Sequence, residues 1–258
     1  MAKGHKSEQE RLATQTKRDK RRAKADRAKA AAEARRKAAK RKERLTYVLV
    51  VGVVLAVVVG GYLLIRALND TSDTAAAPEG ASGEYGIVLG QEDAPTEVVI
   101  YEDFLCPFCA QLEGVLGDQL DTAIEQGDVR VEFRTLNFLS QAGDYSLRAA
   151  NAFAAVSETA GPEAAKEFHD LVFAEQPSES GPFPDDDFLV EKAVEAGADE
   201  GEVRPLIEDL GFEGWVEDGT EAASRDGIRQ TPTVLVDGQR TVGESPQQIA
   251  SEVFAAIG

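Results

Sequence analysis

The sequence predicts an α/β domain over residues 85–258, with a helical segment inserted between its strands. Three observations support this prediction. An apolar, β-branched run at 98–101 is followed by apolar residues at helical spacing and then by an alternating run at 129–133, which together make a β-α-β unit. Helical periodicity continues over about 140–227. The remaining residues have the pattern of a hairpin and a final helix, and the whole length is ordinary for one domain.

The first 44 residues differ in charge from the rest of the chain. They contain 9 Lys and 9 Arg against 4 Glu and 2 Asp, a net charge of +12, whereas the whole chain carries −18. The remaining residues must therefore carry −30. Such asymmetry indicates two environments. Residues 1–44 are expected to form a basic cytoplasmic segment that attracts anionic lipid headgroups. Nucleic-acid binding is not expected, because no aromatic residue stands between its charged residues.

An apolar segment at 45–66 follows the basic one. Residues 45–65 are 21 residues without a charge, and at 1.5 Å per residue a helix of this length spans about 31 Å. One transmembrane helix is therefore predicted, with Tyr47 and Tyr62 near its ends, where aromatic rings favour the interface. A cleaved signal peptide is the alternative. Because 44 residues precede the segment and it exceeds the usual apolar core of a signal peptide, an uncleaved signal anchor is favoured.

The charge flanking this segment predicts its orientation. Positive residues crowd its N-terminal side, and only Arg66 stands close on the other side. The N-terminus is therefore expected in the cytoplasm and the C-terminal domain outside the cell membrane, in a compartment that permits disulfides. Residues 67–84, rich in small and polar residues, are predicted to be a flexible linker between membrane and domain.

The two cysteines of the chain lie where the first predicted strand passes into a helix. Pro107 suits the first position of that helix, which places Cys106 at the N-cap. Unpaired N–H groups and the helix dipole favour a thiolate there, so Cys106 is expected to be acidic and exposed. Cys109 lies one turn later on the same face, within reach of Cys106. The pair therefore predicts a reversible two-electron redox switch.

The cysteines have three other possible interpretations. A structural zinc site needs four ligands, but beyond the pair only His5 and His169 are available as soft ligands. A purely structural disulfide would close a loop too short to stabilise the fold appreciably. Coincidental burial of two cysteines on one helix is the third. The order of strand, Cys-Pro-x-Cys and helix favours the redox interpretation over all three.

The outer domain resembles DsbA-like thiol-disulfide oxidoreductases, of the membrane-anchored bacterial kind. Three stretches spread over most of residues 85–258 carry the resemblance: 103–109 around the cysteines, 146–150 at the start of the helical insertion, and 227–233 before the hairpin. The resemblance implies a thioredoxin-like fold with an inserted helical subdomain. It also implies that the Thr231–Pro232 bond is cis and lies beside the cysteines, where Thr231 would pair with an extended substrate segment.

The resemblance further implies a function. Cys106 and Cys109, with Pro107 and Phe108 between them, would form the catalytic disulfide that oxidises reduced or unfolded exported proteins. A quinone-linked membrane protein would reoxidise it. Phe108 stands where many relatives of this type have His, so Cys106 is expected to be less acidic and its disulfide less oxidising than theirs.

Other polar residues near the motif have less specific interpretations. Asp103 is a candidate for proton transfer to or from Cys109, and Glu102 a weaker one. His169 is expected to be a packed or a surface histidine rather than a catalyst, and Trp215 is expected in the core. The sequence indicates no small-molecule cofactor and no metal. A disulfide reductase, an isomerase and a membrane-tethered binding or holdase protein remain alternative functions, and only the last would survive replacement of Cys106.

Overall fold

The structure is a computed structural model, and it describes residues 76–83 and 85–258. The predicted basic segment 1–44, the predicted membrane anchor 45–66 and most of the predicted linker lie outside the described residues. Among the residues it describes, no helix is both long and apolar enough to cross a membrane. The first two segments therefore stay predictions from the sequence.

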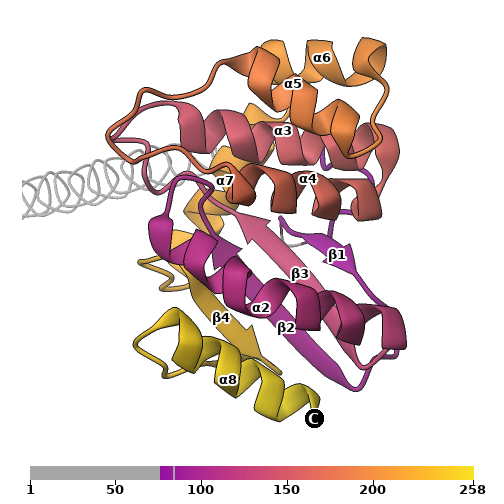
Figure 1. Cartoon of the computed structure of the whole chain (residues 1–258), viewed down its shortest axis with the longest axis vertical. Coiled ribbons are helices and arrows are strands. Elements are labelled where there is room, and N and C mark those ends of the chain that lie inside the picture. The colour runs from indigo at the N-terminus through magenta and orange to yellow at the C-terminus, as the bar shows by residue number, and fades with distance from the viewer. Residues whose placement is uncertain (1–75, 84) are drawn as a thin grey trace, which may run out of the picture. The chain divides into compact units, whose positions relative to one another are not determined.

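A five-stranded sheet forms the centre of the domain, in the order β1-β3-β2-β4-β5 (Figure 1). β2 and β3 pair in parallel, as the β-α-β pattern predicts, and β1 and β4 run antiparallel to them. The strands are β1 (Ile87–Leu89), β2 (Thr96–Glu102), β3 (Val129–Thr135), β4 (Thr233–Val236) and β5 (Gln239–Arg240).

Alternate residues of β2 face two different layers of the domain. Val98 and Ile100 belong to the main core, on the side covered by α2 (Pro107–Gln126) and α8 (Pro246–Ile257). Val99 and Tyr101 pack in a second cluster with Ala223 of α7 (Glu213–Arg225). Both faces of the strand are therefore buried, which explains why its sequence is a continuous apolar run rather than an alternating one.

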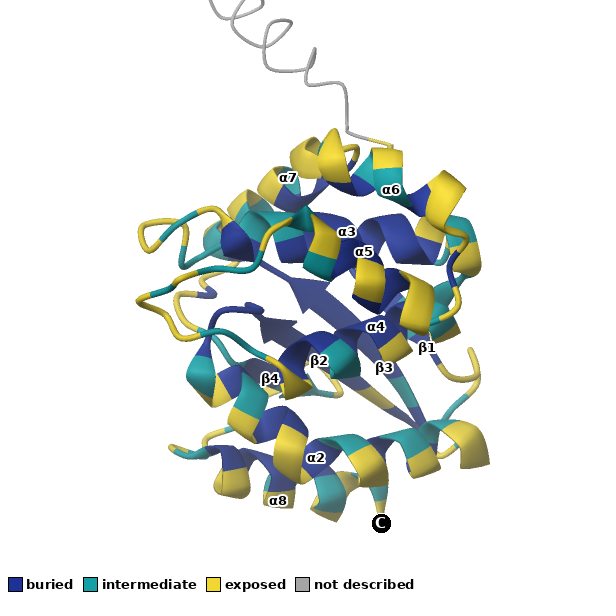
Figure 2. Cartoon of the chain, turned by 45° about the horizontal axis from the view of Figure 1, so that its top comes forward, coloured by how far each residue is buried: buried dark blue, intermediate teal, exposed yellow. Residues whose placement is uncertain are grey.

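Five helices lie between β3 and β4, as the sequence predicted for 140–227. They form a layer over one end of the sheet, and dark blue buried residues line the sides that face it in Figure 2. Asp185 and Asp199 are the N-cap residues of the third and fourth of these helices, and their side chains accept hydrogen bonds from backbone N–H groups of the first turn. The five are α3 (Tyr145–Ala160), α4 (Pro162–Ala174), α5 (Asp186–Glu195), α6 (Glu200–Glu208) and α7.

Two elements at the edges differ from the sequence analysis. β1 was not predicted, because three residues carry too little periodicity to show a strand. The domain also starts before residue 85: Ser157 donates a hydrogen bond to the carbonyl of Glu79, and Ala81 forms a bridge with Ile87. Part of the segment expected to be linker therefore contacts the domain.

The C-terminal hairpin follows its predicted turn. Asp237 and Gly238 have φ values of 49° and 75°, the left-handed conformations that a two-residue type I′ turn requires. Gly238 adopts its value without steric cost, and Asp is one of the residues that tolerate it. The turn returns the chain for α8, whose N-cap Ser245 accepts a hydrogen bond from the backbone of Gln248.

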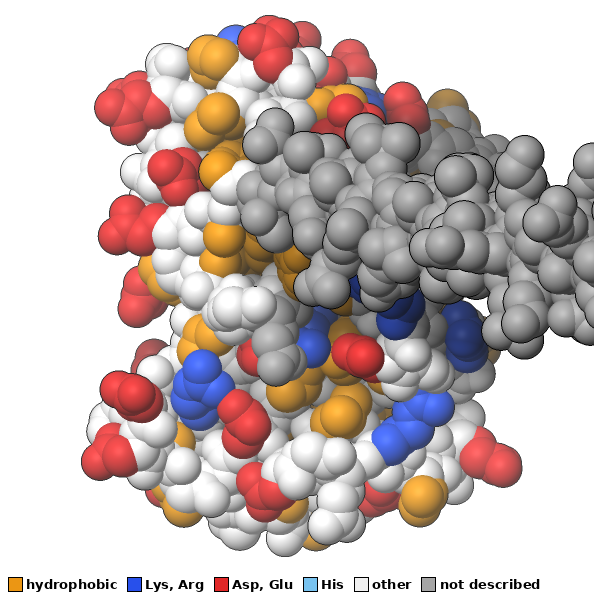
Figure 3. Space-filling view, turned by 180° about the vertical axis from the view of Figure 1, so that it is seen from behind, with side chains coloured by type: hydrophobic (Ala, Val, Ile, Leu, Met, Phe, Trp, Pro, Cys, Tyr) orange, Lys and Arg blue, Asp and Glu red, His pale blue; other side chains and the backbone are white. Residues whose placement is uncertain are grey.

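Acidic side chains are dispersed over the surface of the inserted helices. On the face drawn in Figure 3 they stand mostly singly, among polar and apolar neighbours. Arg204, a third exposed, is paired with Asp187, Glu200 and Glu208. Exposed ion pairs of this kind stabilise a fold by little, so the acidic surface serves mainly to keep the domain solvated.

Candidate active site

Cys106 lies at the N-cap of α2, as predicted. Its backbone is extended, with φ −77° and ψ 115°, and Pro107 is the first helical residue. The carbonyl of Cys106 accepts hydrogen bonds from the N–H groups of Cys109 at 3.0 Å and Ala110 at 3.3 Å. The sulfur is therefore held beside the N–H groups that begin the helix, where negative charge is favoured.

Both cysteines are free thiols and both are buried. The prediction that Cys106 would be exposed is wrong, since only 6% of its surface is accessible; Cys109 is 1% accessible. The loop before β4 covers Cys106, and its Sγ lies 3.3 Å from the carbonyl oxygen of Thr231. Sequence spacing could not show this cover, because 125 residues separate the two.

The Thr231–Pro232 peptide bond is cis, as the family resemblance implied. This loop, which the resemblance implied at the substrate site, thus meets Cys106 in space. Between the cysteines, Phe108 is 58% exposed, whereas Phe104 just before them is completely buried. The motif therefore presents one apolar ring to solvent and anchors another in the core.

The two thiols differ strongly in acidity. The largest influence on the pKa of Cys106 is a hydrogen bond from the side chain of Cys109, which favours the thiolate. Hydrogen bonds from Thr231 and from the backbone of Cys109 and Phe108 favour the thiolate further. Together they outweigh burial and lower the pKa of Cys106 to about 6. Burial, the bond to Cys106 and the nearby charges of Cys106 and Glu102 raise the pKa of Cys109 well above its usual value. Cys106 is thus the thiolate and Cys109 the protonated partner.

This asymmetry predicts a two-step titration of the reduced protein. One thiolate should appear with a midpoint at about pH 6. The second should not appear until well above pH 9, the ordinary pKa of the group. Ultraviolet absorbance of the thiolate measures both steps, and Cys106→Ser should remove the lower one. A single step near pH 9 for both sulfurs would contradict the assigned roles.

The same shift makes the stability of the reduced protein depend on pH. In the unfolded chain Cys106 titrates near 9.0 and in the folded one at about 6. Between these values the unfolded state binds more protons at Cys106, so the contribution of Cys106 to stability rises with pH, is fully present above about 9, and is lost as the pH falls through about 6. Other buried groups with shifted pKa values, such as His169, titrate in the reduced and the oxidised form alike. The free energy of unfolding of the reduced form minus that of the oxidised form, measured in denaturant, should therefore rise across this range.

Asp103, the candidate for proton transfer, is completely buried behind the cysteine loop. Its carboxylate accepts hydrogen bonds from the N–H groups of Leu105 and Leu139, both at 2.9 Å, and from the hydroxyl of Ser146 at 2.7 Å. Burial raises the pKa of Asp103 against the effect of these bonds. The side chain therefore joins the cysteine loop to the segment before α3 and to α3 itself, and its role in proton transfer stays a prediction.

Gln176, just after α4, also binds the cysteine loop, here through backbone carbonyl groups. Its Nε2 donates to the carbonyl oxygens of Phe104 and Cys106, each at 3.0 Å. The sequence analysis missed this residue, because a single Gln between helices carries no local signal. It connects the inserted helices to the residue that bears the reactive sulfur.

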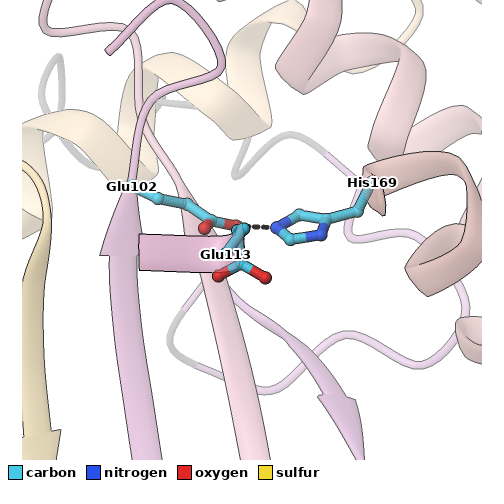
Figure 4. A group of neighbouring side chains, drawn as sticks. All are labelled: Glu102, Glu113 and His169. Carbon is cyan, nitrogen blue, oxygen red and sulfur yellow. Dashed lines mark hydrogen bonds and ion pairs between the residues drawn. The ribbon is translucent and has the colours of Figure 1, made fainter. Parts of the chain in front are cut away.

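Three further residues that the sequence did not bring together meet behind Cys109. Glu102 at the end of β2, Glu113 in α2 and His169 in α4 point toward one another, as Figure 4 shows. His169 Nε2 lies 2.8 Å from Glu102 Oε1, and its Nδ1 lies 2.9 Å from Asp170 Oδ1. His169 is completely buried, which is the first of the two positions, packed or surface, that the sequence left open. Burial works against its charged form, but the two glutamates raise its pKa to about 10.

Comparison with known proteins gives the relatives of this domain. The family model described as Thioredoxin matches residues 82–253. The Na(+)/H(+) antiporter NhaA 3 of Salinispora tropica is 32% identical over 156 residues, which are 60% of this chain. That match covers only 22% of the antiporter, so the chain spans about a fifth of this relative's length.

Two solved structures are similar over most of their own length. Oxidised DsbA of Mycobacterium tuberculosis is 28% identical with a TM-score of 0.57, and the match covers 67% of this chain and 93% of that one. MdbA of Corynebacterium diphtheriae, a thiol-disulfide oxidoreductase, is 29% identical with a TM-score of 0.59, covering 70% of this chain and 93% of that one.

Proposed function

Since this chain belongs to the thioredoxin family and is a DsbA-like thiol-disulfide oxidoreductase, we propose that it introduces disulfides into exported proteins through Cys106 and Cys109. The observation that carries the proposal is the opposite shift of the two thiol pKa values, down for Cys106 and up for Cys109. A stabilised thiolate at the N-cap makes the reduced form of the pair more stable, and that makes its disulfide a better oxidant.

The proposed reaction starts from a Cys106–Cys109 disulfide. A thiolate of a reduced substrate attacks the sulfur of Cys106, the bond to Cys109 breaks, and Cys109 takes up a proton, as its raised pKa favours. A second substrate thiolate then attacks the substrate sulfur of the mixed disulfide. Cys106 leaves as a thiolate, which is a good leaving group because its pKa is low. The substrate loses two electrons and the cysteine pair gains them.

The loop of Thr231 and Pro232 would hold the substrate during this exchange. The carbonyl of Thr231 already lies against Cys106 Sγ, so an extended segment lying along the loop would place its own sulfur beside Cys106. Exposed Phe108 would add an apolar contact. Such recognition reads the backbone rather than a particular sequence, which suits an enzyme that acts on many unfolded chains.

The proposed setting is the outer face of the cell membrane. The predicted anchor at 45–66 would hold the domain there, with the basic N-terminus in the cytoplasm. The substrates would be reduced or unfolded exported proteins, and a quinone-linked membrane protein would return the pair to its disulfide state. No step requires a cofactor besides the cysteine pair itself.

The reduction potential of the pair tests this direction of electron flow. The full chain in detergent is equilibrated with glutathione buffers, and the fractions of thiol and disulfide are measured. A value near about −120 to −180 mV would support the oxidase. A value near about −270 mV or below would contradict the oxidase and favour a reductase.

A further inference from the structure

The buried group of Glu102, Glu113 and His169 has the composition of a metal site. One possible ligand atom from each residue, two carboxylate oxygens and an imidazole nitrogen, lies within 4.8 Å of the others. The three come from a strand end and two helices and converge on one point (Figure 4). Neither cysteine belongs to this group, so it is distinct from the redox pair.

Three of its four carboxylate oxygens lack hydrogen-bond partners. Glu113 is 9% exposed, and neither of its oxygens accepts a hydrogen bond; Glu102 is 1% exposed, and its Oε2 also has no partner. Most buried side-chain polar atoms in proteins do have a partner, and an unsatisfied buried group destabilises the fold by about 1–3 kcal/mol, more when it is charged. A cation bound between them would satisfy these oxygens.

His169 is oriented as metal-binding histidines are. Its Nδ1 faces the carboxylate of Asp170 at 2.9 Å, and Nε2 faces the two glutamates. With the proton on Nδ1 and donated to Asp170, the lone pair of Nε2 is directed at the ligand position. A carboxylate that holds the far nitrogen of a ligating histidine is the usual outer partner at such sites.

A groove of about 220 Å³ between α2 and α4 leads to Glu113. Gly114 and Gly117 line the groove on the side of α2. A Cβ at Gly114 would have no atom within 4 Å, so the groove is open at this position. Asp118, Asp121 and Asp170 also line the groove, and Lys166 pairs with the last two. Three carboxylates against one ammonium group leave the groove negative. A small hydrated cation is attracted there and can reach the buried carboxylate.

We propose that Glu102, Glu113 and His169 bind one divalent transition-metal cation, with Zn²⁺ as the best match. Imidazole together with carboxylate suits Zn²⁺ and its neighbours, whereas Mg²⁺ and Ca²⁺ prefer oxygen alone. Three protein ligands leave a fourth position for water on the groove side. The cation takes the place of the proton between His169 and Glu102, and that proton is released to solvent.

Titration of the oxidised full chain with Co²⁺ tests the proposal, because the disulfide removes both sulfurs as ligands. We expect the visible absorption of a low-coordinate Co²⁺ site, saturating at about one ion per chain and displaced by Zn²⁺. The absorption should lack the near-ultraviolet band of a thiolate–cobalt bond. Glu113→Gln, which keeps the shape of the side chain, should weaken binding by at least about tenfold, the least that even outer-partner changes cause at metal sites.

Asp118→Asn provides the matched control, since Asp118 lines the same groove but is not one of the three ligands. It should still bind one Co²⁺ per chain, and its loss of affinity should be far smaller than that of Glu113→Gln, because it removes a nearby charge and not a ligand. If Glu113→Gln proves poorly folded by near-ultraviolet circular dichroism, Glu102→Gln replaces it. Equal binding by the unchanged chain and a folded Gln variant, a thiolate band, or no saturable binding would each overturn the proposal. Activity in disulfide exchange is not used, so failure of the proposed oxidase would leave this result unaffected.

Discussion

Replacing Cys106 by Ser is expected to reduce disulfide exchange to the rate of the uncatalysed reaction. Cys106 is the residue whose sulfur lies at the N-cap of α2 and whose pKa is lowered to about 6. A hydroxyl at this position is neither ionised at neutral pH nor able to form a disulfide. Oxidation of a reduced model protein in a glutathione buffer measures the loss.

Cys109→Ser gives the contrasting half of this experiment. Cys106 keeps its position at the helix start in this variant, so its thiolate should still attack an added disulfide such as oxidised glutathione, form a mixed disulfide with it and release one glutathione thiolate. Without Cys109 that adduct cannot be resolved within the chain. Mass spectrometry should therefore find a glutathione or substrate adduct on Cys109→Ser and none on Cys106→Ser. Adducts on both, or on neither, would contradict the assignment of Cys106 as the attacking sulfur.

Replacing Phe104 by Ala is expected to lower the free energy of unfolding by about 3–5 kcal/mol, as for other fully buried aromatic residues. Phe104 is completely inaccessible, although it stands in the loop two residues before Cys106. Its ring lies 4.9 Å from that of Phe173 and 6.0 Å from that of Phe153, measured between ring centroids. The substitution would leave a cavity between the cysteine loop and the inserted helices. Denaturant unfolding, followed through Trp215, measures the change.

Phe108→Ala is the matched control for this prediction. Phe108 is the same residue type in the same motif, but it is 58% exposed. Its loss should change the free energy of unfolding by no more than about 0.5 kcal/mol. Similar losses for Phe104→Ala and Phe108→Ala would show that the loop is not anchored through Phe104 as the structure indicates.

The parts predictable from the sequence are those whose residues are neighbours in the chain. The run at 98–101, the proline after Cys106 and the apolar spacing of α2 are local patterns, and each reports backbone geometry directly. The Asp237-Gly238 turn is predictable for the same reason, because its conformation excludes most other residues. The place of Thr231 and Pro232 came instead from resemblance, since nothing local links them to the cysteines.

The parts that were missed depend on contacts between distant segments. Cys106 was expected to be exposed because it lies at a helix start; the resemblance placed the loop of Thr231 and Pro232 beside the cysteines, but the extent to which Cys106 is buried depends on the tertiary packing. His169 was expected to be either packed or on the surface; 67 residues separate it from Glu102, and no periodicity indicates that their side chains meet. Gln176 was overlooked because its two hydrogen bonds reach back more than 70 residues to Phe104 and 70 to Cys106. Such contacts require the tertiary structure.

The hydrogen bonds from Gln176 also indicate which segments would have to be transferred together to give another protein the redox activity of the cysteine pair. They join the end of α4 to the carbonyl of Cys106, while Asp103 joins the same loop to α3. A four-residue Cys-Pro-Phe-Cys graft on a foreign helix would bring the sulfurs without these supports. The smallest transplantable unit for protein design is therefore the cysteine loop together with α3 and α4, and the inserted helices are as much a part of the reactive centre as the motif itself.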